Sequence, residues 1–481
     1  MTRFTRRQFL KGATAAGAAL ALPTQRVLGA NDDVRMGFIA VGRHGSNLMR
    51  HFGHRDGVRV VALADPDREH LGAAHEERPE ADAYTDFRRI LDRDDVDAVV
   101  IANCVHWNAV AACWAVEAGK DVYVEKPHAH NLWESQQLAG RAQHYGKLVQ
   151  VGTQNRSNML YAELKEFLDS GEIGAIQYAR QVTYTRYNSR GPIGMRDEPM
   201  TPPEHVEYDL WLGPAQDEPI YRDRLQREWH YVWNTGGGDA TNWGAHWIDD
   251  VYNIVLRDPG KLPKTCMSAG GRVLYNDAGE TPNAYFAFYE TDSVPVSTEI
   301  HHLPVEPGSE DMGEVRGAWS GYVIQCEGGY YSGGRNEGTV YDNGGNEIRT
   351  FRGTADHVSN FLDAVRAQDK SMLNAPIEVS HYPFGMCHMG NVSYRLGETF
   401  DADHVREVAS KHAFWEEVLQ DFYDRLEAHG VDVENDPGLR SGPVIEMDPE
   451  TETLTGPTAT PEAEALLGRE YREPYALKPL T

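Results

Sequence analysis

Short apolar runs alternate with helical stretches along the first third of the chain, and this alternation restricts the fold more than any other feature of the sequence. The runs expected to form strands are 34–41, 58–64, 98–102, 121–124 and 148–151. The helical stretches between them lie near 43–54, 67–78, 107–118 and 131–145. Continuous apolar strands that alternate with helices are typical of a parallel sheet covered on both faces. We therefore predict an α/β domain with a doubly wound parallel sheet over residues 33–153.

The pattern changes after this domain. Residues 176–185 are long, alternating and rich in Tyr, Thr and Val, as expected of an antiparallel strand. Further strands are expected near 265–275, 284–290, 296–303 and 320–326, and helices near 157–170, 243–255, 354–368 and 405–429. We predict an α+β domain with an open, mostly antiparallel sheet over 154–400. Residues 401–481 are expected to form a C-terminal helix and a tail that wraps over the surface, with a short helix at 463–467.

Residues 1–30 have the character of an export signal. Arg6 and Arg7 precede Phe9-Leu10-Lys11, and an Ala- and Gly-rich apolar run follows over 12–22. A basic segment before a short apolar run is typical of a secretory signal, and the paired arginines indicate the twin-arginine route. The run is shorter than the roughly 20 residues of a spanning helix. We expect contact with the twin-arginine export machinery, a periplasmic or extracellular location, and no stable membrane insertion after processing.

The charge balance and the cysteines exclude several classes of protein. The chain has 73 acidic and 46 basic residues among 481, a formal net charge of -27. Such a surface repels phosphate backbones, so we expect no binding to nucleic acid. The five cysteines are dispersed, without the spacing of a disulfide framework or a zinc site, and we assign no metal-binding residues.

A glycine-rich loop, Ala40-Val-Gly-Arg-His-Gly-Ser46, follows the first predicted strand and precedes a helix. Gly42 lets the backbone approach a pyrophosphate, and Gly45 lets the helix pack closely on the sheet. Asp65 ends the second strand, where a carboxylate binds the ribose 2′-hydroxyl. This carboxylate favours NAD over NADP, although Arg68 nearby weakens the preference. The cofactor-binding residues expected here are Gly42, Arg43, His44, Gly45 and Asp65. The alternative is a glycine-rich turn in an unrelated α/β protein.

A second motif, Val124-Glu-Lys-Pro-His128, follows a buried strand at the carboxyl edge of the predicted sheet. Ligands bind at this edge in such folds. Lys126, between Glu125 and Pro127, is placed where desolvation tunes a lysine toward proton transfer. The alternative interpretation is a surface lysine paired with its neighbour.

A third motif spans Gly236–Asp249. Its glycines let the chain pass close to a ligand, and Asn242, His246 and Asp249 have the spacing of one helix face. His246 is a candidate to remove a proton from an alcohol, and Asn242 to hold a hydroxyl. The alternative is a helix cap followed by a packed histidine.

Taken together, these motifs resemble the Gfo/Idh/MocA oxidoreductase family. The residues that carry the resemblance are Met36–Gly45, Ile101–Asn108, Glu125–Pro127, Val151–Gln154 and Gly236–Asp249. The resemblance implies a Rossmann domain followed by a mostly antiparallel α/β domain, with the substrate between them. It also implies NAD or NADP as cofactor, and sugars or polyols as substrates.

The resemblance also assigns roles to single residues. Lys126 matches the family's catalytic lysine, and His246 matches its catalytic or substrate-binding histidine. Many members carry Asp where this chain has Asn242, so a His–Asp relay is in doubt. Lys126 and His246 must then carry out the proton transfer. The further residues expected to bind the cofactor are Asn103, His106, Glu125, Lys126 and Pro127. Those expected to bind substrate are Gln154, Tyr184, Asn242 and His246.

These observations predict an exported NAD(P)-dependent oxidoreductase that acts on the CH–OH groups of a sugar, polyol or related carbohydrate. Export away from cytoplasmic cofactor pools favours a tightly bound nucleotide that is reduced and reoxidised within one cycle. Two alternatives remain: a redox-neutral, NAD-dependent glycoside hydrolase of the same family, and a carbohydrate-binding protein that has lost catalysis. The resemblance implies a homo-oligomer.

Overall fold

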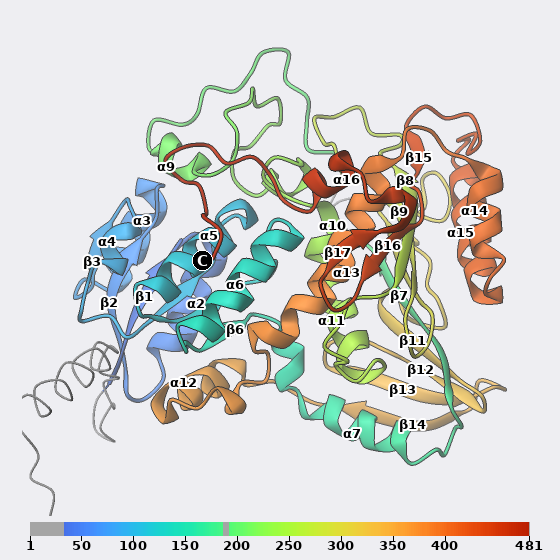
Figure 1. Cartoon of the computed structure of the whole chain (residues 1–481), viewed down its shortest axis with the longest axis horizontal. Coiled ribbons are helices and arrows are strands. Elements are labelled where there is room, and N and C mark those ends of the chain that lie inside the picture. The colour runs from blue at the N-terminus through green and yellow to red at the C-terminus, as the bar shows by residue number, and fades with distance from the viewer. Residues whose placement is uncertain (1–32, 186–191, 481) are drawn as a thin grey trace, which may run out of the picture.

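The computed structural model describes residues 33–185 and 192–480. The predicted signal at 1–30 lies outside these ranges. Two sheets dominate the fold, one in each half of the molecule, and helices cover both (Figure 1). Within the described ranges, no helix is both long and apolar enough to cross a membrane.

The N-terminal half contains a six-stranded parallel sheet in the order β3-β2-β1-β4-β5-β6. Its strands are β1 (Val34–Ile39), β2 (Val58–Ala64), β3 (Asp82–Tyr84), β4 (Ala98–Ile101), β5 (Asp121–Val124) and β6 (Val149–Val151). Its helices are α2 (Arg43–Gly53), α3 (Arg68–Glu77), α4 (Arg88–Leu91), α5 (Val105–Glu117) and α6 (Leu132–His144). The sequence pattern predicted five of these strands, and the short edge strand β3 is an addition. The doubly wound parallel sheet is confirmed.

A helix from much later in the chain completes this half. The segment α12 (His357–Ala367) packs Phe361 and Leu362 against β1, β5 and α2. The ring of Phe361 lies 6.1 Å from Phe52 and 5.8 Å from Tyr123, in edge contacts. The parallel sheet is therefore buried on this face by residues outside 33–153.

The C-terminal half contains an eleven-stranded sheet in the order β14-β13-β12-β11-β7-β10-β9-β8-β16-β17, with β15 also paired to β8. All its pairs are antiparallel except that of β10 with β7. Its strands are β7 (Ile176–Tyr184), β8 (Thr265–Gly271), β9 (Ala284–Glu290), β10 (Val296–His301), β11 (Ser320–Cys326), β12 (Gly329–Gly333), β13 (Glu337–Asp342), β14 (Glu347–Arg352), β15 (Leu439–Ser441), β16 (Ile445–Asp448) and β17 (Thr453–Thr455). The mostly antiparallel sheet is confirmed, and part of the expected tail contributes three of its strands.

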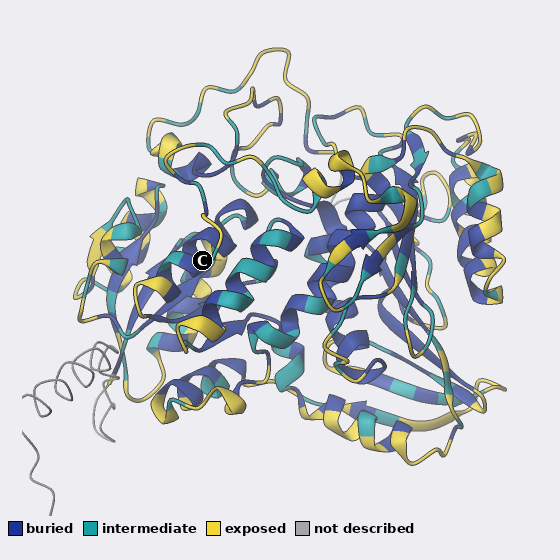
Figure 2. Ribbon diagram, in the orientation of Figure 1, coloured by how far each residue is buried: buried dark blue, intermediate teal, exposed yellow. Residues whose placement is uncertain are grey.

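Helices cover both faces of the central strands (Figure 2). On β9, Tyr285 and Tyr289 join the core formed with α11 and α13, whereas Phe286 and Phe288 face the opposite side. The ring of Phe288 stacks on Trp415 of α15 at 4.7 Å. A strand buried on both faces needs apolar residues at successive positions, which explains the sequence Ala-Tyr-Phe-Ala-Phe-Tyr of β9. The helices of this half are α7 (Met159–Asp169), α9 (Tyr208–Leu212), α10 (Gly238–Asn242), α11 (Gly244–Ile254), α13 (Ile377–Leu396), α14 (Ala402–Ala409), α15 (Ala413–Ala428) and α16 (Pro461–Leu466).

Candidate active site

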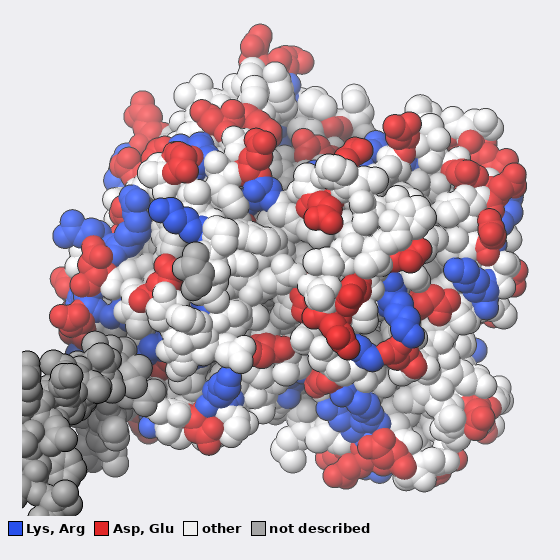
Figure 3. All heavy atoms as spheres, viewed as in Figure 1, with Lys and Arg blue, Asp and Glu red and all other residues white. Residues whose placement is uncertain are grey.

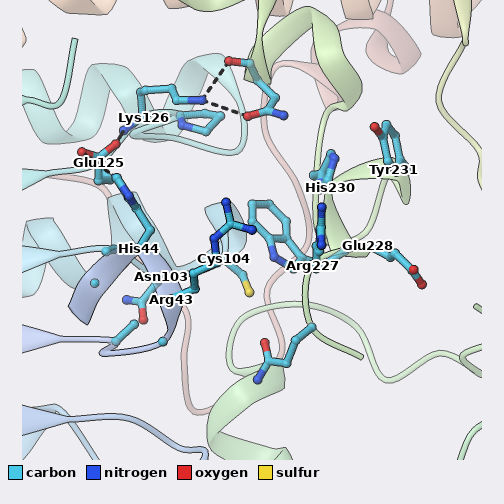
Figure 4. Close-up of a pocket in the computed structure, with 18 of the residues that line it drawn as sticks. Arg43, His44, Asn103, Cys104, Glu125, Lys126, Arg227, Glu228, His230 and Tyr231 are labelled. Carbon is cyan, nitrogen blue, oxygen red and sulfur yellow. Dashed lines mark hydrogen bonds and ion pairs between the residues drawn. The ribbon is translucent and has the colours of Figure 1, made fainter. Parts of the chain in front are cut away.

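A cleft of about 1960 Å³ lies where the carboxyl edge of the parallel sheet meets α10, α11 and the strand ends of the second sheet (Figure 4). Most of the residues predicted from the sequence line it together. These are Gly42, Arg43, His44, Gly45, Asp65, Asn103, Glu125, Lys126, Pro127, Gln154, Asn242 and His246. Residues separated by up to 200 positions in sequence are therefore brought to one cavity, as a two-domain binding site requires.

The glycine loop connects β1 to α2 and turns sharply. Ala40, at the position of the first motif glycine, adopts a φ of 64°. A Cβ on Gly45 would lie 1.9 Å from the carbonyl oxygen of Ala40, so only glycine permits this approach of helix to strand. The first N–H groups of α2 remain at the cleft, because no side chain caps the helix at Gly42. This is the backbone arrangement that binds a pyrophosphate.

Asp65 follows β2 and is held by the backbone. Its carboxylate accepts hydrogen bonds from the N–H groups of Val41, at 2.8 Å, and Asp67, at 2.9 Å. Burial raises the pKa of Asp65 to about 6. The side chain is oriented toward the cavity beside the glycine loop, where it can accept a hydrogen bond from a ribose hydroxyl.

His44 and Glu125 form a pair at the base of the cleft. His44 Nε2 lies 3.2 Å from Glu125 Oε1, and this contact raises the pKa of His44. Glu125 is buried against Gly152, where a Cβ would lie 2.6 Å from its carboxylate. The glycine loop and the Glu-Lys-Pro motif are thus joined by a hydrogen bond that sequence spacing did not reveal.

Lys126 spans the cleft from β5 to α10. Its Nζ donates to the side-chain oxygen of Asn242 at 2.9 Å and to the backbone oxygen of Asn242 at 3.0 Å, shown by the dashed lines in Figure 4. The Lys126–Pro127 peptide bond is cis. Buried Asn108 supports this turn, because its Nδ2 donates to the carbonyl oxygens of Glu125 at 3.2 Å and Pro127 at 2.7 Å.

The amide of Asn242 is oriented by a buried pair behind it. Asn242 Nδ2 donates to Asp239 Oδ1 at 2.9 Å, so the amide oxygen faces Lys126. Asp239 Oδ2 in turn lies 2.8 Å from His302 Nε2, and neither of these two side chains is exposed. Asp239 and His302 were not predicted. Asp239 lies within the third motif, but His302 directly follows β10 and carries no local signal.

His246 lies on α11 at the cleft, but the helix is not continuous with Asn242. Helix α10 ends at Asn242 and α11 begins at Gly244, so the expected single helix face is wrong. Asp249 instead accepts from Arg156 Nε at 2.8 Å in the buried core. The guanidinium of Arg335 lies 3.3 Å from His246 Nε2. Because a guanidinium only donates hydrogen bonds, Nε2 is the acceptor.

Two predicted residues do not line the cleft. His106 is fully buried in α5, where its Nε2 lies 3.0 Å from the carbonyl oxygen of Trp211 and burial lowers its pKa to about 3. Tyr184 donates to Glu299 at 2.8 Å on the face of the sheet covered by α15, because side chains alternate along β7. Thr185, the next residue, lines the cleft instead. We correct both assignments: His106 and Tyr184 have packing roles.

The residues present fit a nicotinamide dinucleotide. The close approach at Gly45, the uncapped start of α2 and the carboxylate of Asp65 match its pyrophosphate and ribose. Among the described residues, Asn103 Nδ2 and Gln154 Oε1 are buried at the cleft without a hydrogen-bond partner. Buried polar atoms are normally satisfied, so these two atoms indicate a polar ligand.

Comparison with known proteins agrees with this geometry. Residues 34–153 match the NAD-binding Rossmann-fold domain of the oxidoreductase family, and residues 162–270 match its C-terminal alpha/beta domain. The two matched regions are the two domains of the Gfo/Idh/MocA oxidoreductase family. Residues 3–23 match a twin-arginine translocation signal sequence, which indicates export across a membrane.

Curated relatives share part of the chain. A glycosyl hydrolase family 109 protein of Shewanella pealeana is 33% identical over 170 residues, which cover 29% of this chain and 37% of the relative. An inositol 2-dehydrogenase of Salmonella paratyphi B is 33% identical over 144 residues, covering 29% of this chain and 43% of the relative. The chain thus spans less than half the length of these relatives.

Solved structures with low identity share the fold. The WlbA dehydrogenase of Bordetella pertussis, in complex with NADH and UDP-GlcNAcA, has a TM-score of 0.52 and 17% identity, covering 76% of this chain and 97% of that one. An oxidoreductase of Agrobacterium radiobacter, in complex with NAD+, L-tartaric acid and magnesium, has a TM-score of 0.51 and 14% identity, covering 74% and 94%.

Proposed function

We propose that this protein is an exported NAD-dependent oxidoreductase that acts on a secondary alcohol of a sugar, polyol or related carbohydrate, with a tightly held nucleotide. The observation that carries the proposal is the contact of Lys126 with Asn242, at 2.9 Å, in a cleft that also contains the glycine loop and His246. It brings a proton-transfer group of one domain to the substrate side of the other. The carboxylate of Asp65 supports NAD over NADP.

The chemistry divides between the cofactor and the chain. Oxidation of a secondary alcohol removes a hydride and a proton, and a bound nicotinamide dinucleotide accepts the hydride. The hydroxyl proton passes to the unprotonated Lys126 amine or to His246 Nε2, both of which line the cleft. The Asn242 amide oxygen holds the Lys126 side chain in place. Asn242 cannot itself take up a proton, because an amide has no titrating group in this range.

Two experiments test the proposal. Mass spectrometry of the nucleotide released on denaturation should identify NAD. Lys126→Met should lower turnover by about 10²–10⁴ while nucleotide binding survives, because the phosphates are held by the glycine loop. The matched control is Lys411→Met, at an exposed lysine outside the cleft. Full activity of Lys126→Met would remove this lysine from the mechanism, and absence of any nucleotide would contradict the cofactor assignment.

A second candidate is redox-neutral glycoside cleavage, favoured by the 33% identity to the glycosyl hydrolase family 109 relative. Both reactions begin with hydride abstraction and need the same residues. They differ in products. The oxidoreductase reaction gives an oxidised sugar together with an equivalent amount of a reduced sugar. Glycoside cleavage gives a free sugar with no net redox change. A protein that only binds carbohydrate would show no turnover on any sugar.

A further inference from the structure

The wall of the cleft opposite the glycine loop is built from strand ends of the second sheet. Thr185 follows β7, Ser320 begins β11, and Arg335 follows β12. These strands are adjacent, because Ser320 pairs with Thr183 and Tyr322 pairs with Gly333. All three side chains line the cleft, close to His246. We call Thr185, Ser320 and Arg335 the strand-end wall.

Arg335 lines the cleft without a carboxylate partner. Among the described residues, no carboxylate lies within ion-pair distance of its guanidinium, whose side-chain contact is His246 Nε2 at 3.3 Å. By contrast, Arg349 and Arg352 on β14, two strands away from β12, pair with Glu163 and Glu337. The chain carries a net charge of -27, and carboxylates are spread over both halves of the face in Figure 3. A guanidinium left without a carboxylate in a cleft is a ready site for an anionic group.

The hydroxyl groups of the same wall also lack partners. Thr185 is 6% exposed, and the buried side-chain oxygens of Thr185 and Ser320 have no hydrogen-bond partner among the described residues. Buried hydroxyls without a partner are uncommon and require an explanation. Beside them, Trp319 is 57% exposed and lines the cleft. A hydroxyl pair, a guanidinium and an open aromatic face are the groups that recognise a sugar ring bearing an acidic substituent.

We propose that the strand-end wall binds an anionic group of the substrate, a carboxylate or a sulfate ester, so that the substrates are acidic sugars. This proposal rests on the proposed function and deepens it. Arg335 donates two hydrogen bonds to the anion, and the Thr185 and Ser320 hydroxyls donate to its remaining oxygens. Glu310, Asp311 and Glu314 also line the cleft, and none of them is ion-paired with Arg335.

Binding of the anionic group also controls whether His246 can act as a base. While Arg335 donates to His246 Nε2, that atom cannot accept the hydroxyl proton of the substrate. An anionic group competes for the same guanidinium N–H and draws Arg335 away from the imidazole. Once the Arg335 contact is broken, His246 Nε2 can accept the hydroxyl proton. Neutral sugars leave this contact intact, so the preference for acidic sugars appears in turnover as well as in binding.

The first test uses inorganic sulfate and does not depend on the identity of the sugar. The holoprotein, with ¹³C-labelled histidine, is titrated with sodium sulfate at constant ionic strength, and the His246 ring signal is assigned with a His246→Asn variant. A saturable shift of this signal is expected in the wild type and is lost in Arg335→Gln. The control Arg352→Gln, which breaks a surface ion pair on β14, keeps the shift. No saturable shift in the wild type, or an equal shift in Arg335→Gln, would overturn the proposal.

The second test compares galactose with galacturonate and galactose 6-sulfate by calorimetry on the same proteins. The acidic sugars should bind the wild type about tenfold or more tightly than galactose, and Arg335→Gln should remove this advantage. Carboxylate and sulfate are distinguished by which of the two binds. Equal binding of all three sugars would overturn the proposal. Mass spectrometry of the released nucleotide is run in parallel, so a protein without NAD marks failure of the proposed function separately.

Discussion

Lys126 and Asn242 join the two halves of the protein through a hydrogen bond of 2.9 Å between the ammonium and the amide oxygen. The family resemblance implies a carboxylate at this position, where this chain has an amide. The lysine is therefore held by a dipole instead of an opposite charge. We expect this difference to influence the pH at which Lys126 can accept a proton.

Asn242→Asp tests this relationship. A carboxylate beside Nζ stabilises the ammonium, so the pH of half-maximal activity should rise by about one unit or more. Asn253→Asp is the matched control, because Lys165 donates to the Asn253 side chain away from the cleft. The measurement is the pH profile of turnover. An unchanged profile in Asn242→Asp would show that Lys126 does not titrate in the catalytic step.

Gly45→Ala tests the nucleotide site. The added Cβ would lie 1.9 Å from the Ala40 carbonyl oxygen, so the loop or α2 must move and nucleotide binding should be lost. The control is Gly72→Ala in α3, where nothing lies within 4 Å of the added carbon. Nucleotide content after purification is the measurement. If Gly45→Ala retained the nucleotide content of the wild type, the nucleotide would bind at a site other than the glycine loop.

Asp65 predicts a pH dependence of nucleotide binding. Burial raises the pKa of Asp65 to about 6, and only the carboxylate accepts hydrogen bonds from both ribose hydroxyls. Affinity for NADH should therefore fall by about tenfold per pH unit well below the pKa of the group, and reach a plateau above it. Asp65→Asn should flatten this dependence. His70→Gln is the control: it removes the imidazole whose Nδ1 lies 3.9 Å from the Asp65 carboxylate, and the fall in affinity at low pH should persist. Fluorescence titrations would measure the affinity for NADH between pH 5 and 8. This range is roughly the span over which such a carboxyl group changes charge.

A buried ion pair predicts a large loss of stability. Arg469 lies 2.6 Å from Glu134, whose side chain is completely buried. Removing the cation in Arg469→Met leaves a buried carboxylate without its partner, which should lower the free energy of unfolding by about 3–5 kcal/mol. The surface pair of Arg406 with Glu434 gives the comparison, since Arg406→Met should lower the free energy of unfolding far less. Chemical denaturation measures the free energy of unfolding of both variants. Equal effects would contradict the assignment of Arg469 and Glu134 as a stabilising buried ion pair.

The sequence predicted the parallel sheet well because its signals are local. Each strand is a short apolar run, and each helix follows within a few residues. Helix α13 was missed although it is the longest in the described ranges. It contains Pro383 and is buried almost all round, so it lacks an amphipathic pattern.

The site was predicted where motif and fold coincide, as at Gly45, Lys126 and Asn242. It could not be predicted where partners come from distant strands. His302 and Arg335 touch the motif residues only because β10 and β12 end at the cleft. Tyr184 was misplaced by one position. One face of β7 carries Tyr178 and Tyr184 and the other carries Thr183 and then Thr185, and the alternation alone does not say which face is inward.

The C-terminal segment makes the parallel-sheet half dependent on chain far away in sequence. Arg469 binds Glu134, and Arg141 donates to the carbonyl oxygen of Lys478, across 335 and 337 residues. Contacts of such separation form late in folding, after the entropy of closing long loops has been met. The parallel-sheet half therefore completes its folding only when the rest of the molecule has assembled around it. For a chain with a twin-arginine signal, we expect the dinucleotide site to be complete only in the fully folded protein.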